Sequence, residues 1–158
     1  MAIYMKLNKG IKGPITADGF KDWIELSSLN WGVDRTIGTA ARSSTSRESS
    51  EPNFHEVVVT KEYCVASPKL FLAAVGPLDH EVEIKFTTTA DGKMETFLTI
   101  KLEDVAVSHY SLTSSGNMPV ETLSLNYDKV TKTFTGHDPK VSGSPETVGF
   151  HLSGGKKI

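Results

Sequence analysis

The fold of this chain is decided by METFLTIKLEDVAVSHYSL at residues 94–112 and VETLSLNYDKVTKTF at residues 120–134. In both segments apolar residues alternate with polar ones, as Leu98, Ile100 and Leu102 do in the first. A period of two residues is typical of a strand with one buried face. The connecting residues TSSGNMP have the composition of a reversing turn. The two segments are therefore predicted to form a long antiparallel hairpin.

The alternation shifts by one position within each segment. After Asp104 the apolar residues are Val105 and Val107, and after Asp128 the next one is Val130. Because the side chains of a strand point alternately to its two faces, such a shift indicates a bulge or a bend. Bends at both positions would curl the hairpin, so they favour a barrel over a flat sheet.

Two further segments, residues 22–31 and 54–61, carry apolar side chains on both faces of a predicted strand. A strand that is apolar on both faces must be covered on both sides. In a barrel wall one face meets the interior, and the other needs a helix or a second chain. We therefore expect four side chains in the barrel wall or in a subunit interface: Trp23, Trp31, Val57 and Val59.

One short helix is predicted at about Ser67–Val75. Ser67 is expected to be the N-cap, Pro68 is suited to the first helical position, and Gly76 follows the end. At about 1.5 Å per residue this helix is only ~12 Å long and covers part of the barrel. Shorter stretches predict further strands at residues 3–7, 82–88 and 148–152.

Length and composition exclude several classes of protein. The 158 residues fit a single domain. The formal net charge of -2 gives no electrostatic reason for nucleic acid or an anionic membrane to be the partner. No apolar run is long enough to span a membrane, and the N-terminus lacks the apolar core of an export signal. We expect a protein made in the cytoplasm, and export by a machine that ignores N-terminal signals stays open.

The segment GTAARSSTSRESSEPN, residues 38–53, has no apolar side chain larger than alanine except the ring of Pro52. A structureless connection of this length is uncommon in a compact domain. Folded out and back, it could project roughly 25 Å at about 3.3 Å per extended residue. Its mixed charges suit a polar contact with another copy. The predicted contact residues are Arg42, Ser43, Ser44, Arg47, Glu48 and Glu51. Residues 153–158 are predicted to be a short flexible tail.

Cys64 is the only cysteine and the sharpest candidate for a catalytic group. A thiolate beside the imidazole of His55 or His80 would be a workable acyl-transfer pair. The alternative, that Cys64 packs beneath the predicted helix, is favoured because no other catalytic pattern accompanies it. The sequence contains no GxSxG elbow, no HExxH motif and no zinc-ligand spacing. We predict no catalytic residue, cofactor or metal. A thiol-dependent hydrolase or transferase on a β-barrel and a monomeric ligand-binding barrel stay as alternatives.

Six collinear stretches span nearly the whole chain. They are IYMKL at residues 3–7 together with IKG at 11–13, DWIEL at 22–26, WGV at 31–33, VTKEY at 59–63, ASPKLF at 66–71 and ETLSLNYDKV at 121–130. Together they resemble the Hcp (haemolysin-coregulated protein) family, the tube proteins of the type VI secretion system. The chain departs from the family at Cys64, where many members have an acidic residue, and at Asn30, where serine is common.

The resemblance implies a mainly β fold, a compact β-barrel of two antiparallel sheets with one short flanking α-helix. It implies that six copies form a ring with a wide pore, that rings stack into a tube, and that residues 38–53 reach the adjoining ring. The implied partners are further copies of the chain, a VgrG-type spike protein, a contractile sheath and small effectors held in the pore, where Asn30 is expected. The protein would be secreted without a cleaved signal peptide. A phage-like tail-tube protein is a close alternative.

Overall fold

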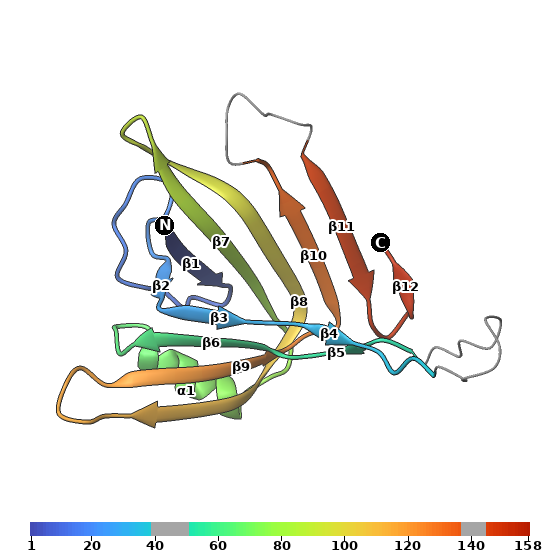
Figure 1. The fold of residues 1–158 in the computed structure, drawn as a ribbon. Helices are drawn as coiled ribbons and strands as arrows, with labels where there is room; N and C mark the ends of the chain where they lie inside the picture. Colours follow the sequence, from blue (N-terminus) through green and yellow to red (C-terminus); the bar gives the residue numbers. More distant parts are fainter. Residues whose placement is uncertain (39–50, 137–144) are drawn as a thin grey trace.

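The computed structural model describes residues 1–38, 51–136 and 145–158. The described chain is mainly β and contains one short helix (Figure 1). In chain order the elements are β1 (Ala2–Leu7), β2 (Ile24–Leu26), β3 (Ser28–Asn30), β4 (Val33–Asp34), β5 (Asn53–Phe54), β6 (Val57–Glu62), α1 (Ser67–Val75), β7 (His80–Ala90), β8 (Lys93–Thr113), β9 (Val120–Asn126), β10 (Lys129–Phe134), β11 (Glu146–His151) and β12 (Lys156–Lys157).

The strands form two antiparallel sheets that share β8. Sheet A has the order β12-β11-β10-β8-β7-β1-β2, and sheet B consists of β3, β6, β9 and the second part of β8. Figure 1 shows the two sheets inclined to each other, with α1 behind β6 and β9. The path of paired strands stays open between β2 and β12. The predicted fold of two antiparallel sheets with one short helix is confirmed, although the barrel does not close completely.

The bend predicted in the first long segment lies in β8 at Asp104, whose backbone has a φ of 52°. Before the bend β8 pairs with β7 and β10, and after it β8 pairs with β9. The buried side chains change from Ile100 and Leu102 to Val105 and Val107 at this point. The bend therefore passes one strand from sheet A to sheet B while its apolar side chains continue to face the core.

The second long segment is not one strand, as a simple hairpin would require. It divides into β9 and β10 at Tyr127 and Asp128, where the alternation shifts. β9 pairs with the second part of β8 and β10 with the first. The shift in the sequence therefore marks the corner at which this segment also changes sheet.

The segment predicted as one strand from residue 22 to residue 31 is also divided between the sheets. β2 pairs with β1 in sheet A, and β3 pairs with β6 in sheet B. Ser27 stands between them and donates its backbone N–H to the carbonyl oxygen of Thr60 at 2.8 Å. The apolar residues at both odd and even positions of residues 22–31 therefore reflect a corner between the two sheets.

The core lies between the facing sides of the two sheets and beneath α1. Its largest fully buried apolar side chains include Met5, Ile24, Leu70, Ile84, Leu102, Leu123 and Leu125. A smaller cluster lies on the opposite face of β1, where Tyr4 packs with Phe20 and Trp23. The chain thus covers both faces of β1 with its own residues.

The helix begins and ends where the sequence predicts, with Pro68 in its first turn and Gly76 after its last residue. The predicted N-cap is wrong. The cap position is held by Ala66, and no side chain caps the helix. The hydroxyl of Ser67 instead donates to the buried carboxylate of Glu121 and accepts hydrogen bonds from Lys61 Nζ and from the N–H of Cys64.

The two segments predicted to project or to fray are partly paired. At the base of residues 38–53, β4 and β5 form a two-stranded ribbon that includes Asn53. Within residues 153–158, β12 pairs with β11, and the N–H of Ile158 donates to the carbonyl oxygen of Gly149 at 3.0 Å. The backbone of the C-terminal residues is therefore hydrogen-bonded to sheet A.

The left-handed backbone at Asp104 gives a test of the bend. Replacing Asp104 by valine should lower the free energy of unfolding by about 1–2 kcal/mol, because a branched side chain disfavours this conformation. Asp104→Gly should be close to neutral, because glycine adopts it freely. Urea denaturation of the two variants measures the difference, and equal losses would contradict a conformational role for this position.

Candidate assembly surface

Sheet A extends beyond sheet B, so part of its core-facing side has no second layer of strands over it (Figure 1). Leu98 pairs in register with Phe86 on one side and with Phe134 on the other. On the same face of the sheet, and two residues nearer the core, Val148 pairs in register with Lys132. Phe134 is 50% exposed and Val148 is 56% exposed. We call Phe86, Leu98, Phe134 and Val148 the sheet overhang.

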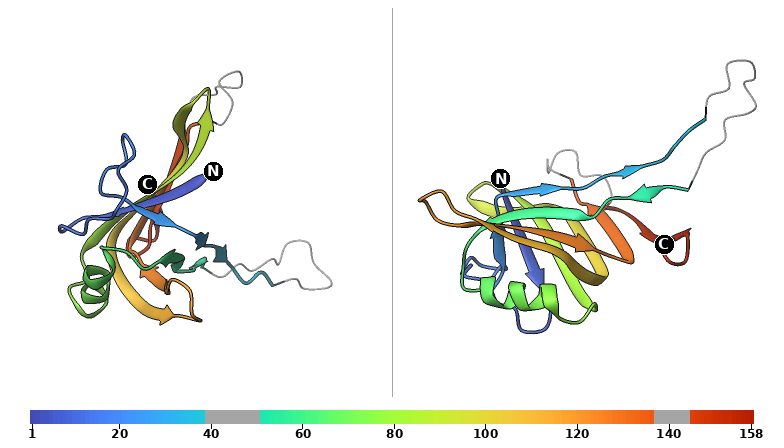
Figure 2. Two further views of the ribbon diagram at one scale, coloured as in Figure 1. Left: turned by 90° about the vertical axis from the view of Figure 1, so that its left-hand side faces the viewer. Right: turned by 90° about the horizontal axis from the view of Figure 1, so that it is seen from below.

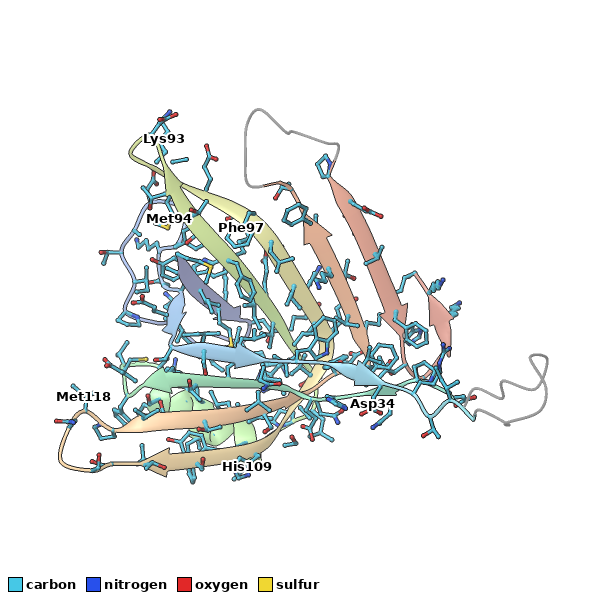
Figure 3. The ribbon with its side chains drawn as sticks, in the orientation of Figure 1. Asp34, Lys93, Met94, Phe97, His109 and Met118 are labelled. Carbon is cyan, nitrogen blue, oxygen red and sulfur yellow. The ribbon has the colours of Figure 1, made fainter. Side chains whose placement is uncertain are left out.

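The side chains drawn in Figure 3 place this surface in the molecule. Met94 and Phe97 are labelled on the same upper part of sheet A, close to the turn that contains Lys93. Asp34 and His109 lie at the level of sheet B, well away from it. The strand registers place Phe86 and Leu98 on the same face as the buried Ile84 and Ile100, two residues farther along each strand, so the sheet overhang continues the core face of sheet A.

The helix α1 carries a second exposed apolar surface. Leu70 and Ala73 face the core, and the opposite side of the helix points away from the strands (Figure 2). The exposed apolar residues on and beside α1 are Val65 (71%), Phe71 (52%), Leu72 (61%), Val75 (70%) and Leu78 (71%). We call these five residues the helix patch. Several large exposed apolar side chains on and beside one short helix indicate a site of interaction with another molecule.

A buried ion pair lies beneath the start of α1. Lys61 on β6 and Glu121 on β9 are joined at 2.5 Å between Nζ and Oε1, and their side chains are 1% and 0% exposed. The hydroxyl of Ser67 donates to the same oxygen, and the hydroxyl of Tyr110 donates to Oε2. One carboxylate therefore ties three strands of sheet B to the first residue of the helix.

The network keeps Glu121 ionised. Burial by itself would raise the pKa of Glu121, but hydrogen bonds from Lys61, Ser67 and Tyr110 and the charge of Lys61 lower that pKa below its ordinary value. Burial and the hydrogen bond to Glu121 raise the pKa of the Tyr110 hydroxyl. The ring of Tyr110 also meets Phe71 edge-on, with centroids 5.7 Å apart. The network thus contacts the helix patch from below.

The base of residues 38–53 is held to the barrel by side chains. His55 Nε2 lies 2.6 Å from Asp34 Oδ2 across the ribbon. The rings of Phe54 and Phe150 pack against each other in a tilted arrangement, with centroids 4.7 Å apart. These contacts fix the direction in which the chain leaves the barrel at β4 and returns at β5 (Figure 2).

The structure places the side chains predicted for the wall or an interface as follows. Val57 and Val59 are fully buried and Trp23 is 5% exposed, so these three lie in the wall of a single copy. Trp31 is half-buried and donates its indole N–H to the hydroxyl of Tyr127 at 2.6 Å.

The other predicted site residues lie at the edges of the described chain. Asn30 is exposed on β3, and Glu51 is exposed beside the ribbon. The predicted contact residues Arg42, Ser43, Ser44, Arg47 and Glu48 lie outside the described residues. Sequence reasoning did not single out the sheet overhang or the helix patch.

The proposed thiol and imidazole pair is not assembled. Cys64 is half-buried and packs against the core, as the alternative interpretation expected. His55 is hydrogen-bonded to Asp34. His80 is 4% exposed, and neither of its ring nitrogens has a hydrogen-bond partner in the described chain. Burial lowers the pKa of His80 and keeps it neutral.

Asp128, His151 and Ser153 lie together but do not form a catalytic triad. The Asp128 carboxylate and the Ser153 hydroxyl both approach the same nitrogen, Nε2 of His151, at 2.9 Å. A triad requires the acid and the nucleophile on opposite ring nitrogens. Asp128 also accepts the N–H of Ser153 at 2.9 Å. The cluster therefore fastens the C-terminal turn to the corner between β9 and β10.

Within residues 1–38, 51–136 and 145–158, no group of three or more His, Cys, Asp or Glu side chains is arranged to bind a metal ion. Within the same residues no helix has the length and apolar character needed to cross a membrane.

Comparison with known proteins identifies the family. A family model described as "Type VI secretion system effector, Hcp" matches residues 4–134. The chain belongs to the Hcp family. The resemblance inferred from the sequence is thereby confirmed, and the Hcp chain is a protein of the type VI secretion system and not an enzyme. A comparison with curated proteins finds no match.

Solved structures agree with the Hcp fold. A structure titled as a type six secretion system protein has a TM-score of 0.87 at 29% identity, and the match covers 99% of both chains. Hcp1 from Salmonella typhimurium matches with a TM-score of 0.74 at 21% identity over 100% of both chains. A variant of Hcp1 from the E. coli EAEC 042 pathovar matches with a TM-score of 0.76 at 21% identity, covering 96% of this chain and 99% of that one.

The buried ion pair predicts a sharp difference between single and double substitutions. Glu121→Leu alone should lower the free energy of unfolding by about 3–5 kcal/mol, because it leaves the charge of Lys61 buried without a partner. The double variant Lys61→Met/Glu121→Leu should recover most of that loss. Chemical denaturation measures the free energy of unfolding of both variants. The same substitutions at the solvent-accessible pair Lys101 and Glu103 are the matched control. A double variant as unstable as the single one would contradict this account.

Proposed function

We propose that this Hcp chain is a tube subunit: six copies form a ring, and rings stack into a tube. The observation that carries the proposal is the sheet overhang, where Phe134 and Val148 are about half exposed on the core-facing side of sheet A and no described strand lies over them. Side chains such as Phe134 contribute stability when apolar area is removed from water, at about 25 cal/mol per Å². Identical copies arranged in a ring would cover this surface.

The outer face of sheet B has the composition expected of a pore wall. The strand registers place Ser28, Thr60, Thr122 and Ser111 in one row and Asn30, Val58, Ser124 and His109 in the next. Neither row contains Asp, Glu, Lys or Arg. The next row on the same face contains the exposed Glu62, paired in register with Val120. The two uncharged polar rows would let a small effector protein pass or rest in the pore without strong binding, and they include the predicted lumen residue Asn30.

The ribbon of β4 and β5 at the base of residues 38–53 supports stacking between rings. The ribbon of β4 and β5 leaves the barrel in a direction fixed by Phe54, Phe150 and the pair of His55 with Asp34. A projecting polar segment on a fixed base suits contact with the adjoining ring through the residues predicted there. The tube would be driven by a contractile sheath, tipped by a VgrG-type spike, and secreted without a cleaved signal peptide.

The ring is tested by size-exclusion chromatography with light scattering and by electron microscopy of the purified protein. We expect a hexamer for the unaltered chain and a monomer for Phe134→Lys, which places a charge on the sheet overhang. Thr133→Lys is the matched control, because it places the same charge on the opposite face of β10 and should leave the hexamer intact. If the unaltered protein stays a monodisperse monomer at high concentration, the proposed ring is overturned.

Stacking is tested separately by removing residues 41–51. The shortened chain should form rings as well as the unaltered chain does but should fail to form tubes at high concentration. Electron microscopy distinguishes single rings from stacks, and thermal unfolding checks that the barrel still folds. Tubes of ordinary length from the shortened chain would show that this segment does not join rings.

A further inference from the structure

We propose that His80 is a pH-sensitive latch: when its imidazole is protonated, the turn of residues 8–11 separates from the start of β7 and from the loop of residues 76–79. At neutral pH the imidazole carries no charge and the latch is closed. The latch lies within one copy of the chain, so it does not depend on ring formation.

The imidazole of His80 is buried without a partner. His80 is 4% exposed, and on β8 the residue in register with it is the apolar Val105. Among the residues that the structure describes, the two ring nitrogens of His80 are the only buried side-chain polar atoms that form no hydrogen bond. A buried polar group without a partner is costly, and a buried charge without one is far more so. The site therefore tolerates neutral imidazole and disfavours imidazolium.

A cavity of about 280 Å³ lies beside His80, between the turn and α1. Its walls are apolar side chains from the turn, from α1 and from the loop, together with two lysines. The lining residues are Lys9, Ile11, Lys69, Leu72, Ala73 and Pro77. Movement of the turn would widen this cavity and expose the buried ring to water.

The charged groups around His80 favour its neutral form. Lys9 of the turn and Asp79 of the loop form an ion pair with each other. Lys69 of α1 donates to the carbonyl oxygen of Gly10 at 2.8 Å. Burial and the charge of Lys9 lower the pKa of His80 below its ordinary value, and the charge of Asp79 opposes them in part. Protonation would add a further positive charge beneath the turn.

The contacts that close the latch lie on its solvent side. The N–H of Asn8 donates to the carbonyl oxygen of the exposed Glu81 at 3.2 Å, and the N–H of Glu81 donates to Oδ1 of Asn8 at 3.1 Å. The side chains of the ion pair between Lys9 and Asp79 are 36% and 64% exposed. An ion pair in such a position contributes little to stability. A charge on the buried ring can therefore outweigh these contacts.

The direction of the pH dependence follows from the neutral imidazole of the closed latch. The open latch exposes His80 to water, where its ordinary pKa is about 6.5. The stability of the closed form is fully present above that pH and is lost as the pH falls from there through the lowered pKa of the buried ring. At pH 5.5 an exposed imidazole is protonated about ten to one, so acidification from pH 7.5 favours opening by up to about tenfold.

Hydrogen exchange of the unaltered protein, followed by mass spectrometry at about pH 7.5 and pH 5.5, tests the latch. Labelling times are scaled to cancel the effect of pH on the intrinsic exchange rate. We expect the opening of residues 8–11 and 76–82 to rise several-fold at the lower pH, up to about tenfold. The strand β6 should keep its protection. Unchanged protection of residues 8–11 and 76–82 would overturn the proposal.

Two variants attribute the rise to His80. His80→Leu cannot be protonated and should abolish it, whereas His109→Leu makes the same replacement at an exposed histidine of β8 and should leave it unchanged. A rise in His80→Leu as large as in the unaltered protein would overturn the proposal. If His80→Leu does not fold, Lys9→Met decides: it removes a cation that faces His80, so the ratio of opening between the two pH values should shrink, and an unchanged ratio would overturn the proposal.

Discussion

The structure depends on one constraint, that β8 belongs to both sheets. This strand has 21 residues, and its bend at Asp104 assigns the first part to sheet A and the second part to sheet B. A straight strand of this length would span about 70 Å at roughly 3.4 Å per residue. The bend brings the two parts together around one core. The described strands of sheet B do not extend over Phe134 and Val148 of sheet A, which stay about half exposed.

The single helix of the same copy does not cover the exposed part of sheet A. With nine residues, α1 is about 13 Å long at about 1.5 Å per residue, so it covers only part of one face. Its start is fixed by the buried carboxylate of Glu121, which also joins β6, β8 and β9. The helix is therefore held firmly on the barrel while its outer side stays apolar and exposed. A rigid apolar surface loses little freedom when it is buried, which favours association.

Much of the fold could be predicted from the sequence, and the reason is physical. Alternation reports which face of a strand is apolar, so the shifts at Asp104 and Asp128 marked the two corners correctly. Between Trp23 and Trp31 the apolar residues occupy both odd and even positions. This pattern is the same for a strand that is apolar on both faces and for the corner found at Ser27. The role of Ser67 was missed because its buried partner, Glu121, lies far away in the sequence.

The sheet overhang and the helix patch could not be predicted from the sequence, for a related reason. Val130 and Phe134 have the same parity on β10, yet Val130 is 3% exposed and Phe134 is 50% exposed. Alternation identifies the core-facing side of a strand but not what covers it. The same holds for α1, whose Leu72 and Val75 are apolar without facing the core. Only the arrangement of the layers shows that a single copy leaves these side chains exposed.

The central claim is that identical copies cover the surface that one copy leaves open. Hydroxyl-radical footprinting of the unaltered protein tests it directly, by comparing side-chain labelling in dilute and in assembled samples. The account predicts that Leu72 and Phe134, which are 61% and 50% exposed in a single copy, both lose reactivity on assembly. Rings in which both side chains are labelled as strongly as in the dilute sample would contradict it.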